Sequence, residues 1–184
     1  IRNVSRLSSE RVILRSLMKM NQDHKEGGPR ARGRLESIQI SNGGVPKQNV
    51  AAAIEVTLSG LLGDRQRDLR FHGGPDRAVC LFSQEQIDAL RNEGHPIDRG
   101  TTGENLTLSG LDWKLVRPGG RLTVGEVALE ITAPAHPCRK IAGSFADGDF
   151  SRLSAKAHPG RGRMYARVLV PGTIRPGDSV TLET

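Results

Sequence analysis

Aromatic residues are scarce in this chain of 184 residues, and their scarcity limits both the core and the partners. Phe, Trp and Tyr together make up only 3% of the sequence, so a hydrophobic core must be built from aliphatic side chains. Proteins that bind single-stranded nucleic acid stack the bases on aromatic side chains, and six such residues are few for that purpose. The composition therefore argues against nucleic acid as a partner.

Cysteine and long apolar runs are also in short supply. Two cysteines, Cys80 and Cys138, cannot hold an iron–sulfur cluster or a four-cysteine zinc site, and they allow at most one disulfide. No run approaches the roughly 18 apolar residues that a membrane span needs, and no secretory signal is visible. We therefore expect a cytoplasmic protein with one domain, no disulfide and no membrane partner.

Positive charge is concentrated at the N-terminus. Residues 1–33 carry eight Lys or Arg against three acids, whereas residues 34–184 carry 19 against 17. The first part resembles a mitochondrial transit peptide, but a reading frame extended upstream of Met18 or Met20 explains it equally well, and we favour the second explanation. We expect residues 1–33 to form a basic extension, disordered or marginally helical, outside a domain that comprises residues 34–184.

Short segments of alternating apolar residues predict a mainly β fold. Alternation at period two over residues 35–40 predicts a first strand. The nearly continuous apolar run over residues 78–82 is typical of a strand that is buried on both faces. Two alternating segments flank Gly125 and Glu126 and predict a hairpin with a two-residue turn.

One helix is predicted directly after the apolar run. Ser83 and Gln86 form a capping-box pattern at its start. Ile87 and Leu90 share one face, and Gly94 can end the helix. Seven or eight short strands with one or two short helices are typical of a β-barrel or a β-sandwich.

Four loops combine glycine or proline with charged residues. They cover residues 43–47, 60–76, 100–107 and 133–140. Glycine lets a ligand approach the backbone because no Cβ stands in the way, and the basic residues beside it favour an anion. These loops therefore predict a binding site for an anionic ligand.

Cys138 is the strongest candidate for chemistry in these loops. Pro137 keeps it off a regular helix or a central strand, and Arg139 and Lys140 favour its thiolate form. From these residues alone, a free cysteine that merely packs is an equally good interpretation. Cys80, inside the apolar run, is expected to be a core residue.

Two further loop positions have two interpretations each. His72 beside Gly73 and Gly74 is either a catalytic histidine or a hydrogen-bonded turn residue, and the residues alone favour the turn. Glu104 and Asn105 either act in a site or belong to the chemistry of a polar turn, since Asn tolerates a left-handed backbone.

Acid pairs and metal ligands give weaker signals. Asp64 and Asp68 could act as a pair of acids, but arginines alternate with them and surface ion pairs explain them equally well. His136 and Cys138 could begin a metal site, but no further ligands follow at zinc-like spacing. The sequence also has no phosphate-binding loop, dinucleotide fingerprint or nucleophile elbow.

Six segments in these loops and strands together resemble a known family. They are GGVPK at 43–47, GLLGDRQRD at 60–68, HGGPDRAV at 72–79, TTGENLTLSGL at 101–111, PC at 137–138 and RMYARVL at 163–169. In this order they resemble the MOSC domain, which occurs at the C-terminus of molybdenum-cofactor sulfurases and as stand-alone small proteins. The resemblance covers about residues 34–184 and implies a closed β-barrel of the pyruvate-kinase-barrel type.

The resemblance implies a molybdenum cofactor whose metal is bound by a protein cysteine, which here is Cys138. A thiolate is a soft ligand that suits a redox metal. The pterin part of that cofactor carries a phosphate, for which Lys47 and Arg139 are the expected charge partners.

The family also suggests further contacts with the cofactor. In related amidoxime-reducing proteins an Arg-Pro-Asn loop binds the pterin, and residues 103–105 occupy that place here. Only Asn105 matches that motif, so only Asn105 is carried over. Gly73, Gly74 and Thr101 complete the set of expected cofactor contacts.

Stand-alone relatives reduce N-hydroxylated compounds, such as hydroxylaminopurines and amidoximes, to amines, and the resemblance implies this activity. Glu104, His72 and Asp64 are the candidate proton donors. The electrons must come from a separate donor protein, because two cysteines and no nucleotide-binding pattern leave no flavin or iron–sulfur relay. Pyridoxal phosphate is not expected, because 184 residues leave no room for the large sulfurase domain that binds it.

Two other functions compete with reductase activity. Cys138 could carry the cofactor or a persulfide sulfur to another protein, without activity of its own. Alternatively, a non-catalytic barrel could bind an acidic partner through its basic N-terminal extension. The oligomeric state stays open.

Overall fold

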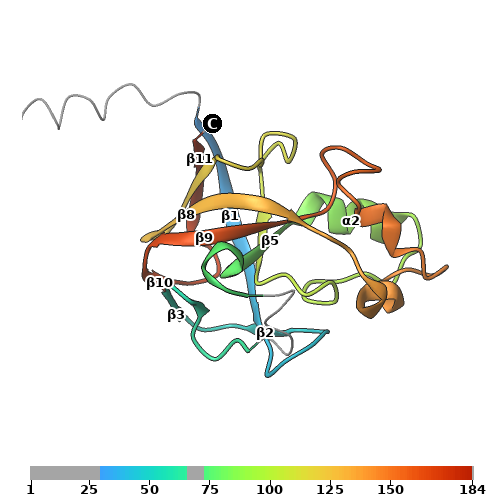
Figure 1. Cartoon of the computed structure of the whole chain (residues 1–184), viewed down its shortest axis with the longest axis horizontal. Helices are drawn as coiled ribbons and strands as arrows, with labels where there is room; N and C mark the ends of the chain where they lie inside the picture. The colour runs from blue at the N-terminus through green and yellow to red at the C-terminus, as the bar shows by residue number, and fades with distance from the viewer. Residues whose placement is uncertain (1–29, 66–72, 184) are drawn as a thin grey trace, which may run out of the picture.

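The computed structural model describes residues 30–65 and 73–183, and most of their regular structure is β (Figure 1). The strands are β1 (Arg30–Ile40), β2 (Gln48–Val50), β3 (Ile54–Thr57), β4 (Gly60–Leu61), β5 (Val79–Ser83), β6 (Leu106–Ser109), β7 (Arg121–Val124), β8 (Val127–Ala135), β9 (Arg163–Val170), β10 (Gly172–Ile174) and β11 (Ser179–Glu183). The helix α2 (Gln84–Asn92) and the 3-10 helices η2 (Pro75–Arg77), η3 (Arg139–Ser144) and η4 (Phe150–Leu153) connect them. No helix of this described part is long and apolar enough to cross a membrane.

Seven strands close into a barrel. Their order around the ring is β1, β11, β7, β8, β9, β5 and β6, and β6 pairs with β1 to complete it. Only β5 and β6 run parallel within this ring. The hairpin of β7 and β8 turns at Gly125 and Glu126, as predicted, because Val124 pairs with Val127. The prediction of a mainly β closed barrel is therefore confirmed.

Aliphatic side chains fill the barrel interior. Alternate residues of each strand point inward, and among them are Leu35, Leu81, Leu106, Leu129 and Met164, all of which are buried. Full burial of a side chain of this size contributes about 1.5–3 kcal/mol. The interior is thus a packed apolar core. The outward-facing residues of the same strands do not take part in it, and some of them are polar.

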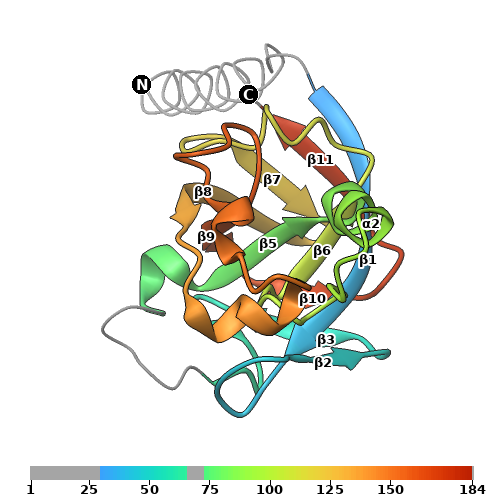
Figure 2. The same ribbon diagram turned by 90° about the vertical axis from the view of Figure 1, so that its right-hand side faces the viewer.

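A second apolar cluster lies outside the barrel and covers one side of it. It consists of Phe82, Ile87, Leu90, Ile97, Ile141, Phe145 and Leu153. In Figure 2, α2 and the orange segment with η3 and η4 lie on the viewer's side of β5 and β6. Because Phe82 on β5 belongs to this cluster while Leu81 belongs to the interior, β5 is buried on both faces, as its apolar run predicts.

The helix α2 begins where the sequence predicts it, but its capping differs in one detail. The Ser83 hydroxyl oxygen accepts a hydrogen bond from the backbone N of Gln86 at 3.3 Å, which is an N-cap. The Gln86 side chain does not complete a capping box, because its Oε1 accepts from the backbone N of Gly162 at 3.0 Å, while its amide donates to the carbonyl of Gly160 at 3.0 Å. The carboxylate of Glu85 accepts the Ser83 hydroxyl instead, at 2.7 Å.

Strand β1 begins ahead of the domain boundary expected at residue 34. Residues 30–34 pair with β11, and this pairing closes the barrel. Residues 30–33 therefore belong to the barrel wall and not to an extension. No local pattern indicates this, because the partner strand lies at the other end of the chain. Residues 1–29 lie outside the described residues.

Candidate functional site

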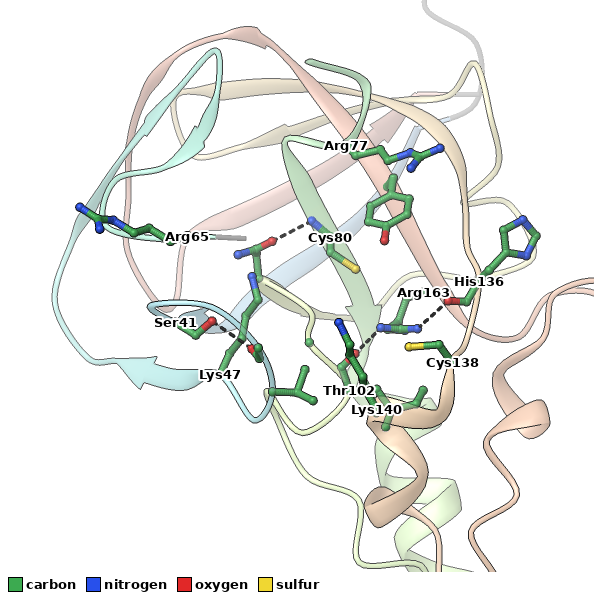
Figure 3. Close-up of a pocket in the computed structure, with 16 residues that line it drawn as sticks. Ser41, Lys47, Arg65, Arg77, Cys80, Thr102, His136, Cys138, Lys140 and Arg163 are labelled. Atoms are coloured by element: carbon green, nitrogen blue, oxygen red, sulfur yellow. Dashed lines mark hydrogen bonds between the residues drawn. The ribbon is translucent and has the colours of Figure 1, made fainter. Parts of the chain in front are cut away.

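A cavity of about 90 Å³ lies on the outer side of the barrel, above β5 and β9 (Figure 3). The two strands contribute Cys80, Arg163 and Tyr165 to its lining. Loops before β2, β6 and η3 contribute most of the rest, including Cys138, and Arg65, Arg77 and the first turn of η3 complete it. The strand period of two explains why β9 reaches the cavity at alternate positions, since Met164 between them points into the barrel.

Cys138 is the half-buried free thiol at the start of η3. Its backbone is extended, with φ −141° and ψ 168°. Its sulfur points into the cavity, toward Arg163 (Figure 3). Lys140 also lines the cavity, whereas Arg139, an expected phosphate partner, is exposed and lies outside the lining. The loop thus brings one nucleophilic or metal-binding sulfur and one cation to the same space.

The guanidinium of Arg163 is buried, and it has no acidic partner among the residues that the structure describes. It donates to the carbonyl oxygens of Thr102 and, at 3.4 Å, His136, and its Nε has no hydrogen-bond partner. No carboxylate of residues 30–65 and 73–183 forms an ion pair with it. A buried charge is costly unless it is paired, so this guanidinium is suited to receive an anionic ligand.

The buried carboxylate of Asp64 accepts three hydrogen bonds beside the cavity. Its Oδ2 accepts from Lys47 Nζ at 2.6 Å and from the Asn105 amide at 2.8 Å, and its Oδ1 accepts from the backbone N of Ser41 at 2.8 Å. The side chains of Lys47 and Asp64 are only 8% and 3% exposed. The alternative of a surface ion pair is thus wrong for Asp64. Asp68, its suggested companion, lies outside the described residues.

Asn105 lines the cavity, but its side chain is occupied by the protein itself. Its Oδ1 accepts from the backbone N of Cys80 at 3.0 Å, and its Nδ2 donates to the carbonyl of Gln39 at 3.2 Å as well as to Asp64. These bonds join β1, β5 and the loop before β6. The residue carried over from the family motif therefore holds the wall of the cavity in place.

Glu104 does not face the cavity. It is fully buried, with Oε1 accepting from the backbone N of Gly100 at 2.5 Å and Oε2 from the Thr102 hydroxyl at 2.7 Å. This is the turn chemistry that the sequence allowed as an alternative. Its neighbour Gly103 does line the cavity, at φ +87°, and an added Cβ there would lie 2.9 Å from Val45 Cγ1.

The remaining expected contacts are placed elsewhere. The Thr101 hydroxyl donates to the carbonyl of Asp98 at 2.7 Å, and Thr102 lines the cavity in its stead. Gly74 borders a different hollow, and Gly73 is not part of the lining. His72 lies outside the described residues. The structure therefore brings together Cys138, Lys47 and Asn105 from the predicted set.

Sequence reasoning missed three cavity residues on the strands. Arg163 and Tyr165 stand at alternate positions of a segment that was noted only for its family resemblance, and this alternation of polar with apolar residues was the available signal. Cys80 is buried as expected, but it faces the cavity and not the barrel interior. Burial raises the pKa of the Cys80 thiol to about 11, so this thiol stays protonated.

Similar proteins place the chain in a family. The family model described as MOSC domain matches residues 68–181, which is more than half of the chain. The protein YflK of Bacillus subtilis (strain 168) is 31% identical over 140 residues, which is 76% of this chain and 62% of YflK. A protein named Reductase from Gibberella moniliformis (strain M3125 / FGSC 7600) is 32% identical over 142 residues, which is 74% of this chain and 25% of that protein.

A solved structure agrees with this fold. The crystal structure of YiiM from Geobacillus stearothermophilus superimposes with a TM-score of 0.65 at 26% identity, over 84% of this chain and 75% of that one. The chain spans less than two thirds of the length of YflK and a quarter of the fungal reductase. By its barrel, its loops and the family model that matches residues 68–181, the chain belongs to the MOSC domain family.

Proposed function

We propose that this chain binds a molybdenum cofactor through Cys138 and reduces N-hydroxylated compounds to amines. The observation that carries the proposal is the pairing of two unusual groups in one cavity. A half-buried free thiol points toward a buried guanidinium that forms no ion pair with a carboxylate of residues 30–65 and 73–183. A ligand that offers a soft metal to the thiol and an anionic group to the cation matches both.

The cavity residues fit such a cofactor. Cys138 would hold the metal as a thiolate, since soft sulfur ligands suit redox metals. Arg163 would bind the phosphate or another anionic part, where its unpaired Nε supports an additional hydrogen bond. When bound, the cofactor would supply two-electron redox chemistry at the metal. The thiol and the cation are thus the two residues whose loss should release it.

The other residues of the site keep these two groups in position. Asp64 ties Lys47 and Asn105 to the backbone of Ser41, so three loops meet at one carboxylate. Arg163 ties the loop around Thr102 to the loop that precedes Cys138. Because a ligand site is useful only when its groups are preorganised, we assign these contacts the role of holding the cavity open and aligned.

A separate protein is proposed as the electron donor, with an N-hydroxylated small molecule as substrate. The relative from Gibberella that bears the name Reductase supports a redox role for this family, at 32% identity. Exposed basic residues surround the opening, among them Arg77 and Lys140. An acidic surface on the donor would complement them.

Cofactor content tests this proposal most directly. The full chain is expressed as wild type, Cys138→Ala and Arg167→Gln in a host that makes the molybdenum cofactor. Molybdenum is measured by mass spectrometry and pterin by fluorescence after oxidation. The Arg167→Gln control changes an exposed residue of β9 outside the cavity. We expect close to one molybdenum per protein molecule in the wild type and in the control, and no molybdenum in Cys138→Ala.

A turnover assay then distinguishes a reductase from a carrier protein without activity of its own. The loaded wild type should reduce benzamidoxime or 6-hydroxylaminopurine with an artificial reductant. A loaded protein that reduces neither compound would favour the alternative, a carrier of the cofactor or of a persulfide sulfur on Cys138. A wild type that holds neither metal nor pterin, in a host that loads a control enzyme, would overturn the cofactor assignment.

A further inference from the structure

Reduction of an N-hydroxyl group needs a proton donor next to the reacting atoms, and the expected acids do not provide one. The Glu104 carboxylate is buried in its own turn, where Gly100 and Thr102 occupy both oxygens. The Asp64 carboxylate is held by Lys47, Asn105 and the backbone of Ser41. Both act as hydrogen-bond acceptors within the protein, and His72, the third candidate, lies outside the described residues. The residues that line the cavity are therefore the next candidates for a donor.

The position of Tyr165 in the cavity makes it a candidate for this proton donor. It lies on β9, directly across from Cys80 on β5, and on its other side it pairs with Ala133 on β8. Its neighbours Met164 and Ala166 point into the barrel, so Tyr165 faces outward and lines the same cavity as Cys138. Ser41 and Thr102 also bring hydroxyls to this lining, but from loops, whereas the Tyr165 hydroxyl is carried by a strand that is paired on both sides.

The charges around Tyr165 favour a hydroxyl that is protonated at rest. Burial raises the pKa of its phenol to about 12, and negative charge on the sulfurs of Cys80 and Cys138 would add to this increase. Arg163 and Arg77 act in the opposite direction, and the Arg77 guanidinium lies 5.8 Å from the ring centroid. The phenol therefore holds its proton at neutral pH, while two cations can stabilise the phenolate that forms when it gives the proton away.

We propose that Tyr165 is a catalytic residue that donates a proton to the oxygen that leaves the N-hydroxylated substrate. The inference rests on the function proposed above and deepens it. The overall reaction converts R–NH–OH, two electrons and two protons into R–NH2 and water. The N–O bond breaks and the nitrogen is reduced by electrons from a flavin- or haem-containing donor protein. Tyr165 gives one proton to the departing oxygen and regains it from water, and the nitrogen takes the second proton from solvent.

Removal of the Tyr165 hydroxyl tests its role as the proton donor. Tyr165→Phe keeps the ring, and Arg167→Gln is the matched control on the same face of β9, outside the cavity. We expect Tyr165→Phe to retain its molybdenum and pterin and to reduce benzamidoxime about a hundredfold more slowly, which is a usual contribution of a general acid. Wild-type turnover in a fully loaded Tyr165→Phe protein would overturn the proposal.

A spectroscopic measurement on the unmutated protein gives a second, independent readout. Tyr165 is the only tyrosine of the chain, so protein grown with ring-labelled 13C-tyrosine gives one Cζ resonance. Addition of the product benzamidine to the loaded protein should displace this resonance, because the product then lies against the hydroxyl. An unmoved resonance with saturating benzamidine would overturn the contact, even if Tyr165→Phe failed to fold.

The two proposals fail in different ways. A wild type without molybdenum and pterin would overturn the cofactor-dependent reductase and the role of Tyr165 with it. A loaded wild type that reduces benzamidoxime, together with an equally active Tyr165→Phe variant, would overturn only the role of Tyr165. Arg167→Gln at the wild-type rate shows that a change on β9 alone does not slow the reaction.

Discussion

The two faces of strands β5 and β9 differ in chemistry although they share one backbone. On the inner face, Leu81 and Met164 join an apolar core in which hydrocarbon contacts hydrocarbon. On the outer face, Cys80, Arg163 and Tyr165 line a cavity together with Cys138. The inner face follows the rule that buried surface is apolar, whereas the outer face buries a guanidinium that has no carboxylate partner within the described part of the chain.

This difference separates stability from function within a few residues. Burial of an unpaired charge costs stability, so the position of Arg163 is unfavourable for a protein that only has to fold. The apolar core on the opposite face contributes favourable free energy that offsets the unfavourable burial of the Arg163 charge. Substitutions on the two faces should therefore have different signatures, and the following changes test whether they do.

The largest loss of stability is expected where polar groups depend on one another. Lys47→Met leaves the Asp64 carboxylate buried without its cation, so we expect the free energy of unfolding to fall by about 3–5 kcal/mol. Urea denaturation measures this free energy of unfolding. Adding Asp64→Asn to Lys47→Met should recover part of the loss, since the stranded charge disappears. A double variant as unstable as the sum of the single variants would contradict a coupled pair.

A change on the inner face should reduce stability and leave the site intact. Leu81→Ala removes a fully buried side chain from the barrel core, and the lost contacts plus the resulting cavity should cost about 2–5 kcal/mol. We expect the folded variant to retain its molybdenum. Loss of the cofactor from a protein that is still folded would show that the two faces are not independent.

The local elements of the fold could be predicted because their signals lie within a few residues. The turn at Gly125 and Glu126, the buried strand over residues 78–82 and the start of α2 at Ser83 each depend on neighbours in the sequence. The closure of the barrel could not be located in this way. It depends on residues 30–34 pairing with β11 at the far end of the chain.

The site was only partly predictable for the same reason. The cysteine with its basic neighbours is a local pattern, and it identified Cys138. The pairing of Lys47 with Asp64, by contrast, joins residues of two loops that no sequence pattern links. The same holds for Arg163, whose buried Nε lacks a hydrogen-bond partner only because of how the cavity is assembled. Distant contacts thus decided which candidate residues line the cavity.

A change on the outer face should have the opposite signature to Leu81→Ala. Arg163→Met replaces a buried guanidinium that forms no ion pair with the described residues by an apolar side chain of similar length. Removal of the buried charge should offset the lost hydrogen bonds to Thr102 and His136, so the cofactor-free protein should be as stable as wild type or more stable. Cofactor content should fall about 10- to 100-fold, because the anionic group loses its charge-assisted hydrogen bonds. Molybdenum content and urea denaturation of the same preparations measure the two effects.

Arg167→Gln is again the control for Arg163→Met, since both change an arginine on the outward face of β9. The assignment of Arg163 to ligand binding would be contradicted by a variant that is less stable than wild type yet keeps its cofactor. That result would leave the link between the loops at Thr102 and His136 as the role of Arg163, without a contribution to ligand binding.

The smallest effect is expected at Glu85, in the layer outside the barrel and away from the cavity. Burial alone would raise the pKa of this carboxyl, but hydrogen bonds from the backbone N of Gly110 and the Ser83 hydroxyl outweigh it and leave the pKa lowered. A carboxyl whose pKa is lower in the folded state stabilises the fold above its unfolded pKa, and this contribution disappears as the pH falls through the folded pKa.

Glu85→Gln should therefore be less stable than wild type at neutral pH, and the difference should close as the solution is acidified through the lowered pKa of Glu85. Urea midpoints of both proteins at several pH values measure this convergence. Cofactor content should not change, because Glu85 is not part of the cavity lining. A difference in stability that is constant with pH would show that the variant loses packing and not charge. Reduced molybdenum would instead show that the outer layer and the cavity are coupled through α2.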